Sequence, residues 1–275
     1  MIKIVCDSMS DVPEIIIEKY DVEIVPLTVI FNGIEYIDGI DINNKEFYKM
    51  LRESEDMPKT SQATYSQFKE VFEKYKDDEV LYIGGSSSAS GTYQSAVLAK
   101  NDGYENVHVF DTQNLSIGSA LFVIKACEMR EKGYSIEEII DNLNLLKGSE
   151  ELFGAVDTLE YLKKGGRIPS TKAMIGNLLS IKPILFVENG LVSQKSQVRG
   201  KKQTYSALVK YIADIYNNDL ENRTIILGCG DNEKDLDTLK NHLNEEYKVN
   251  DLYCVNMGTA ICSHTGPGVL AISCI

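Results

Sequence analysis

Apolar runs and polar loops alternate regularly through the first half of the chain. Residues 2–6, 80–83 and 107–110 are short apolar runs that predict buried strands. Residues 116–131 and 135–146 carry apolar positions at helical spacing and predict helices. Strands that alternate with helices predict a parallel sheet that is covered by helices on both faces.

Two features interrupt this alternation between the first and second buried strands. Residues 22–31 are rich in β-branched residues and predict one strand. The Asn-Gly pair at 32–33 predicts a hairpin turn, from which residues 34–37 return. Residues 59–64 are polar and predict a loop ahead of the next helix.

The second half of the chain mixes hairpins with helices. A Glu-Asn-Gly turn at 188–190 joins two extended runs and predicts a hairpin. The further predicted elements are strands at 152–156, 224–227 and 252–255 and helices at 159–169, 205–216 and 235–243. We therefore expect an α/β fold of two domains. Residues 1–150 would form an N-terminal α/β/α domain with a parallel sheet, and residues 151–275 a C-terminal α/β domain with a mixed sheet and helices on one face.

Polar loops follow the three buried strands of the first half, directly after Cys6, Ile83 and Phe110. The carboxyl ends of parallel strands meet at one edge of a sheet, where α/β proteins bind ligands, and the loop at 59–64 is expected to reach the same edge. The loop at 84–95 is rich in Gly and Ser and leads into a helix. Because backbone N–H groups at a helix N-terminus attract anions, this loop predicts either an anion site or an ordinary helix cap.

Composition narrows the range of partners. The 275 residues are 43% hydrophobic and 25% charged, as in an ordinary globular protein, and the formal net charge is −13. This acidic balance argues against a nucleic-acid partner. The first residues enter a strand pattern without a signal peptide, and no apolar run reaches the ~20 residues that a membrane span needs. We therefore expect a cytoplasmic protein that does not insert stably into membranes, with its six scattered cysteines reduced.

Basic residues gather in one part of this acidic chain. Residues 155–210 contain ten Lys and Arg residues but only three Asp and Glu residues. Such a segment is either a solvated surface or a docking surface for an acidic protein or a phosphate group. The candidate docking residues are Lys163, Lys164, Arg167, Arg199, Lys201 and Lys202.

Several catalytic signatures are absent from the sequence. It has no GxxxxGK(S/T) phosphate-binding loop, no GxGxxG after a strand and no GxSxG nucleophile turn. No cysteine or histidine spacing is typical of a metal site. His264 lies in a Gly-rich stretch at 263–268, which we interpret as a loop. This stretch is either a tight turn in which the histidine is incidental, or a site at which the imidazole of His264 donates a hydrogen bond to an anion.

Seven short motifs, in order along nearly the whole chain, resemble those of the DegV family of bacterial fatty-acid-binding proteins. They are Asp7-Ser8-Met9-Ser10-Asp11, Thr60-Ser61-Gln62, Ser90-Gly91-Thr92, 162–168, 182–185, 198–202 and His264-Thr265-Gly266-Pro267-Gly268. Ala63 stands where the family often has proline, and Ala271 where it often has glycine. Both departures affect the shape of a loop or helix more than the chemistry of a ligand site.

This resemblance implies a carrier that holds one long-chain fatty acid between its two domains. It implies that Thr60 and Ser90 bind the carboxylate, with Ser61, Gly91, Thr92 and His264 as neighbours. Family members present the bound acid to a separate fatty acid kinase, which forms an acyl phosphate for phospholipid synthesis. The resemblance therefore implies a kinase partner and no catalytic residues, cofactor or metal in this chain.

The tail of such a ligand needs an apolar slot. Each buried CH₂ contributes ~0.8 kcal/mol, so the tail would supply most of the affinity while the hydroxyls orient the head group. Candidate lining residues, for which ordinary core packing is the competing interpretation, are Ile117, Leu121, Ile175, Leu178, Leu179 and Phe186.

Two other functions stay open on the sequence alone. A small-molecule phosphotransferase or hydrolase could use the Ser-rich loop and His264, although the missing motifs argue against it. A regulatory protein could bind lipid as an effector and dock a partner through residues 155–210.

Overall fold

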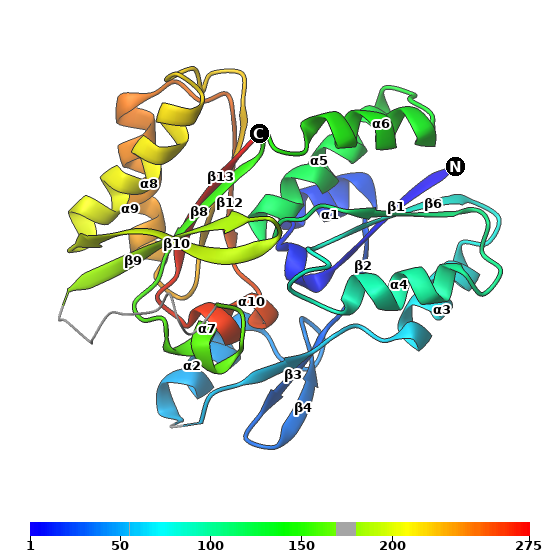
Figure 1. The fold of residues 1–275 in the computed structure, drawn as a ribbon, viewed down its shortest axis with the longest axis horizontal. Coiled ribbons are helices and arrows are strands. Elements are labelled where there is room, and N and C mark those ends of the chain that lie inside the picture. The colour runs from blue at the N-terminus through cyan, green and yellow to red at the C-terminus, as the bar shows by residue number, and fades with distance from the viewer. Residues whose placement is uncertain (55, 169–179) are drawn as a thin grey trace.

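The computed structural model describes residues 1–54, 56–168 and 180–275. Within these ranges the chain forms a four-stranded sheet, a six-stranded sheet and a small three-stranded sheet. In Figure 1 most of the C-terminal half, yellow to red, lies on the left, and most of the N-terminal half, blue to green, lies on the right. This arrangement confirms the expected α/β fold with two domains, whereas a boundary near residue 150 stays a prediction.

The N-terminal half is built on a four-stranded parallel sheet. In spatial order its strands are β2 (Glu23–Val25), β1 (Ile2–Asp7), β6 (Glu79–Gly84) and β7 (Val107–Asp111). Its helices are α1 (Glu14–Tyr20), α3 (Tyr65–Lys74), α4 (Thr92–Lys100), α5 (Ile117–Glu131) and α6 (Ile136–Leu146). Val5 and Tyr82 pack with α3 and α4, while Ile4 and Leu81 pack with α1, α5 and α6. Because successive strand residues point to opposite faces, both faces are covered, as predicted.

The small sheet corrects two predictions made from the sequence. Its strands, in order, are β4 (Ile34–Ile37), β3 (Thr28–Phe31) and β5 (Lys59–Ser61), and the helix α2 (Asn44–Glu53) follows the hairpin. The single strand predicted at 22–31 is wrong, since β2 joins the parallel sheet and β3 joins this one. Pro26 lies between them, where it lacks the N–H that a continuous ladder needs. The loop predicted at 59–64 is also wrong at its start, because β5 pairs antiparallel with β3.

The C-terminal half is built on a mixed six-stranded sheet. In spatial order its strands are β10 (Leu191–Arg199), β9 (Ile181–Glu188), β8 (Glu151–Ala155), β13 (Leu270–Cys274), β11 (Thr224–Cys229) and β12 (Asp251–Asn256). The helices α8 (Lys201–Ile215) and α9 (Glu233–Glu246) pack on one face. Strand β13 was not predicted, although it lies in the middle of the sheet and all its residues are buried.

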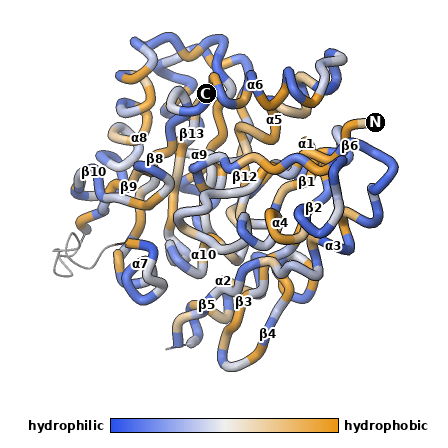
Figure 2. The backbone as a smooth tube through the Cα atoms, turned by 45° about the vertical axis from the view of Figure 1, so that its right-hand side comes forward, coloured by the Kyte–Doolittle hydropathy of each residue, from blue (hydrophilic) through white to orange (hydrophobic). Residues whose placement is uncertain are grey.

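The other face of this sheet packs against helix α5 of the N-terminal half. One core cluster therefore includes Ile117 and Leu121 of α5 together with Leu185 and Ile226 of the C-terminal sheet. Figure 2 shows hydrophobic residues concentrated along the strands and α5, with hydrophilic residues on the peripheral turns. The two halves thus share buried apolar surface, which holds them against each other.

Two short helices lie between the sheets, α7 (Glu160–Lys164) and α10 (Thr259–Thr265) (Figure 1). Helix α10 contacts α7, β3 and β5. The sequence prediction that His264 lies in a loop is wrong, because it occupies the last turn of α10. The Gly-rich stretch begins only after the helix, where Gly266 takes the positive φ of 79° that ends it.

Membrane-spanning helices and metal-binding clusters are both absent from residues 1–54, 56–168 and 180–275. None of the helices there has the length and apolar character required to traverse a bilayer. No group of three or more His, Cys, Asp or Glu residues is arranged to hold a metal ion.

Candidate functional site

A cavity of about 870 Å³, partly open to solvent, lies where the two halves of the chain meet. This volume includes the space that is open to solvent. Most of its lining is apolar, contributed by Met9, Leu27, Ala89, Leu115, Leu152, Gly154, Val156, Leu162, Leu185, Phe186, Val187, Val192, Met257, Ala260, Ile261, Val269 and Ala271. The polar lining consists of Thr60, Ser90, Ser116, Arg167, His264 and Thr265.

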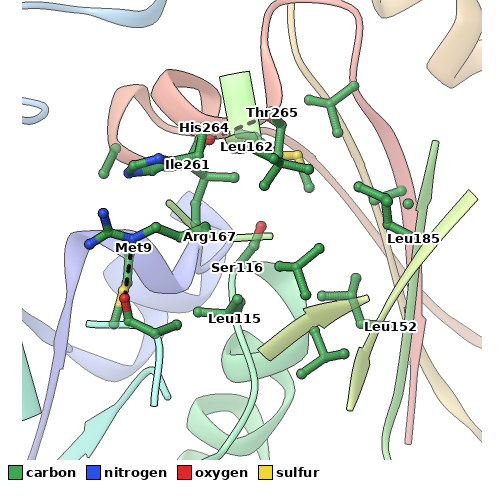
Figure 3. Close-up of a pocket in the computed structure, with 18 of the residues that line it drawn as sticks. Met9, Leu115, Ser116, Leu152, Leu162, Arg167, Leu185, Ile261, His264 and Thr265 are labelled. Atoms are coloured by element: carbon green, nitrogen blue, oxygen red, sulfur yellow. Dashed lines mark hydrogen bonds between the residues drawn. The ribbon is translucent and has the colours of Figure 1, made fainter. Parts of the chain in front are cut away.

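The polar and apolar lining residues occupy different parts of the cavity. In Figure 3, Arg167 and His264 lie on the left, whereas Leu152 and Leu185 lie on the right against strands of the C-terminal sheet. The cavity therefore has a polar end between α10 and the N-terminal half and an apolar end on the sheet. An amphipathic ligand with one charged group fits this distribution.

Thr60 and His264 meet at the polar end. Strand β5 carries Thr60 and α10 carries His264, and the Oγ1 and Nε2 atoms of the two are 2.7 Å apart. Burial, followed by the nearby Arg167 charge, lowers the pKa of His264 to about 4, so the ring is neutral at neutral pH. Its Nδ1 is buried and has no hydrogen-bond partner among the described residues; it faces Gly165, where a side-chain carbon would collide with it.

These contacts decide which ring nitrogen carries the proton. An unpaired buried N–H costs more than an unpaired acceptor, so the tautomer protonated at Nε2 is favoured. His264 then donates to Thr60 Oγ1, and the Thr60 hydroxyl proton is free to donate into the cavity.

Ser90 lies at the cavity wall just before the N-terminus of α4. Its hydroxyl donates to Thr92 Oγ1 at 3.0 Å and accepts from the Thr92 backbone N–H at 3.3 Å. The partial positive charge of this nine-residue helix is therefore adjacent to Ser90. The Ser90 hydroxyl thus accepts an N–H group at the start of α4, as the helix-cap interpretation of this loop expects, and the anion site stays a prediction.

Ser61, Gly91 and Thr92 are near this end but do not line the cavity. Ser61 is exposed. Gly91 leaves room for the Gln62 side chain, since a side-chain carbon at position 91 would collide with it. The Gln62 amide donates to Ser95 Oγ at 2.9 Å. Thr92 is buried and accepts the Ala63 backbone N–H. These contacts join the Thr60 strand to the Ser90 loop, a role for Gln62 that sequence reasoning missed although it belongs to the Thr-Ser-Gln motif.

Arg167 also lines the polar end, although the sequence grouped it with the surface docking residues. Its Nη1 donates to Gly165 O at 2.6 Å and its Nε to Ala89 O at 3.3 Å. It forms no ion pair with a carboxylate in the described ranges of the chain. The other five docking candidates, Lys163, Lys164, Arg199, Lys201 and Lys202, are exposed. Lys201 is paired with Asp235 at 2.8 Å.

The predicted tail-lining residues have mixed outcomes. Phe186 lines the cavity. Ile117 and Leu121 do not, because α5 is buried on nearly all sides and directs them into the shared core. Ile175, Leu178 and Leu179 lie outside the described residues.

Strands β8, β9 and β13 supply much of the apolar lining instead. Gly154 pairs across strands with Leu185 on one side and Ala271 on the other, and all three line the cavity. Directly paired residues point to the same face of a sheet, so two small residues leave a trough beside Leu185.

Comparison with known proteins decides the family. The family model described as "Uncharacterised protein, DegV family" matches residues 1–275. The chain belongs to the DegV family. A DegV domain-containing protein of Clostridium acetobutylicum is 38% identical over 268 residues, covering 96% of this chain and 95% of that protein. A Thermotoga maritima protein named as a fatty acid-binding protein is 36% identical over 276 residues, covering 98% and 96%.

Solved structures of similar proteins share the whole fold. A DegV lipid binding protein from Thermotoga maritima, at 36% identity, superposes with a TM-score of 0.90 over 99% of this chain and 97% of that one. A fatty-acid-binding DegV family protein from Thermus thermophilus, at 32% identity, gives 0.92 over 99% and 98%. A stearic acid-binding protein from Eubacterium ventriosum, at 27% identity, gives 0.91 over 100% and 98%. The DegV membership inferred from the seven motifs is thus confirmed over both halves.

Proposed function

We propose that this DegV protein binds one long-chain fatty acid in the cavity between its two halves. The observation that carries the proposal is the cavity itself, which is apolar except at one end. Burying the tail of a C16 acid contributes on the order of 10 kcal/mol before the costs of ordering the ligand. The names and bound acids of the DegV relatives support the same ligand class.

The carboxylate belongs at the polar end, beside Thr60 and Ser90. Thr60 can donate its hydroxyl proton because His264 supplies the other hydrogen bond. Ser90 donates to Thr92 in this structure, and rotation about its C–O bond would redirect the proton to the ligand. The N-terminus of α4 and the Arg167 guanidinium add positive charge, which strengthens hydrogen bonds to a carboxylate.

We further propose that the protein is a carrier and that catalysis belongs to a separate kinase. Thr60 and Ser90 are half-buried rather than sealed, so a bound carboxylate could be presented to that kinase for acyl phosphate formation. The exposed Lys163 and Lys164 at the end of α7 would help to dock it. In this proposal residues 1–150 and 151–275 are the two domains, with the ligand between them.

Native mass spectrometry of the purified protein tests the proposal. We expect a co-purified acid of long chain length, or uptake of one equivalent of added oleate or palmitate. A protein that carries no acid and takes up neither would refute it. Turnover of ATP or an ester by the isolated chain would instead favour the phosphotransferase or hydrolase alternative.

A further inference from the structure

The Asp7–Asp11 motif lies outside the ligand contacts proposed above, yet the half-buried side chain of its last residue, Asp11, contacts the residues that precede α5 and α10. We infer that Asp11 is a positioning residue for the head-group site. It holds helix α10 in place and thereby keeps the His264 ring in hydrogen-bond contact with Thr60. The inference rests on the proposed function for its biological meaning, but the geometry it concerns can be tested without any ligand.

Both carboxylate oxygens of Asp11 are used. Oδ1 accepts the Gly258 backbone N–H at 2.6 Å, and Oδ2 accepts the Ser116 hydroxyl. Gly258 is the residue that precedes the first turn of α10, and Ser116 holds the same place before α5. A single side chain from the loop after β1 therefore connects the starts of two helices that are distant in sequence.

Helix α10 needs such an anchor because it has only seven residues and lines the cavity with several of them. Asp38 adds a second contact at the same end, where its Oδ1 accepts the Thr259 hydroxyl at 2.5 Å. The other end is held by the contact between His264 and Thr60 at 2.7 Å. At 1.5 Å per residue, His264 lies about 9 Å along the helix from Gly258, so a tilt at the anchored end displaces the imidazole.

The Ser116 contact concerns the cavity wall directly. Ser116 lines the cavity and has φ 49° and ψ −133°, a conformation that residues other than glycine rarely adopt. It is held there by its hydroxyl on Asp11 and by its backbone N–H, which donates to Met9 O at 3.1 Å. Asp11 thus fixes the wall residue and the His264 helix in one mutual arrangement.

Asparagine is a conservative replacement at this position. Burial raises the pKa of Asp11 to about 7, and the nearby Asp38 and Asp7 charges act in the same direction. The Asp11 charge also acts on Tyr48 and Cys262. A protonated carboxyl presents one acceptor and one donor, as an asparagine amide does, so Asp11→Asn can still accept from Gly258 and donate to Ser116. Asp11→Ala can do neither.

The test is an NMR titration of the His264 ring in the full-length, ligand-free protein, with the resonance assigned by its loss in His264→Gln. The groups around this ring are Thr60, Gly165 and Arg167. In Asp11→Ala we expect the pKa of His264 to rise from about 4 towards its ordinary 6.5, because the displaced ring gains solvent. Asp11→Asn should retain the low value.

A matched control is Ser135→Ala, which removes the capping box of α6 far from the cavity and should leave His264 unchanged. If Asp11→Ala does not fold, Ser116→Ala removes one of the two contacts and should raise the pKa of His264 by a smaller amount. Folded variants at Asp11 and Ser116 that all titrate like the wild type would overturn the inference.

Oleate binding measured on the same samples separates this inference from the proposed function. If the wild type binds oleate, Asp11→Ala should reduce acyl phosphate formation by a partner kinase far more than oleate affinity, since misplacing a reacting group by 1 Å can cost about 100-fold in rate. Equal losses of both would contradict a positioning role. Failure of every variant, including the wild type, to bind oleate would refute the proposed function while a shifted His264 would still support the role of Asp11.

Discussion

Gly154 offers a direct test of which surface the acyl tail contacts. It lies on β8 with its Cα facing the cavity, and a side-chain carbon built there would have Ala271 Cβ at 3.7 Å and Leu270 O at 3.9 Å as its nearest neighbours. Both are ordinary van der Waals distances, so Gly154→Ala should fold without strain. A larger residue would extend from that carbon into the trough beside Leu185.

The expected magnitude follows from the volume of tail that is displaced. Gly154→Ala removes space for about one methylene, which corresponds to ~0.8 kcal/mol or about a fourfold loss of affinity for the longest acid. Gly154→Leu introduces four carbons and should cost about 3 kcal/mol, or roughly 200-fold, for a tail that fills the cavity. An acid shorter by about four carbons should lose much less, because its tail does not reach the occupied space.

Dissociation constants for a series of saturated acids from C10 to C18, measured by displacement of a fluorescent fatty acid, provide the assay. The expected result is a shift of the optimum to shorter chains in Gly154→Leu. Phe153→Leu is the control, since Phe153 points to the opposite face of β8, into the core with α8 and α9, and should change stability without changing chain-length preference. An unchanged optimum in a folded Gly154→Leu protein would show that the tail does not lie against this part of the sheet.

Three further predictions concern the head group, pH and docking. Thr60→Ala combined with Ser90→Ala should weaken oleate binding by a few kcal/mol at most, since each hydrogen bond to a charged group contributes about 1.5–3 kcal/mol. The same double variant should lose most of its phosphorylation by a cognate kinase. Full phosphorylation of the double variant would contradict the assignment of these two hydroxyls to the head group. The pKa of Asp11 is about 7 in the folded state, above the unfolded value of about 3.9, so its contribution makes the unfolding free energy fall as pH rises from about 4 to about 7. Urea denaturation at several pH values should therefore show a smaller fall for Asp11→Asn. Lys163→Glu with Lys164→Glu should raise the KM of the kinase for the loaded protein without altering oleate affinity, and an unchanged KM would remove α7 from the docking surface.

The sequence predicts three strands of the parallel sheet, β1, β6 and β7, because they are short apolar runs separated by helices with a clear period. It fails at β5, where Lys59, Thr60 and Ser61 have no strand signal of their own and become a strand by pairing with β3. Such pairing is a tertiary effect that local patterns do not contain. Strand β13 is different, since residues 270–274 are largely apolar and the signal was available in the sequence.

For the candidate site, motif resemblance predicted Thr60, Ser90 and His264, and all three line the cavity; their contact with a ligand stays a prediction. It could not show that Arg167 turns inward, because that depends on where α7 packs against α10. The tail-lining residues were least predictable. Ten of the fifteen residues of α5 are buried, so its sequence has no polar face from which the direction of Ile117 or Leu121 could be inferred.

The anchoring of α10 by the N-terminal half also constrains when the protein can become functional during synthesis. The contact between Thr60 and His264 spans 204 residues of chain, and that between Asp11 and Gly258 spans 247. Contacts of such long range form late in folding, and a ribosome releases the N-terminal half long before the C-terminal end. The parallel sheet can be assembled while translation continues, but the polar end of the cavity needs α10 and the mixed sheet needs β13, so both can form only after residues 258–274 have emerged. A nascent chain therefore exposes the apolar faces of β8 and β9 without a head-group site, and termination before β13 would leave these faces open to aggregation.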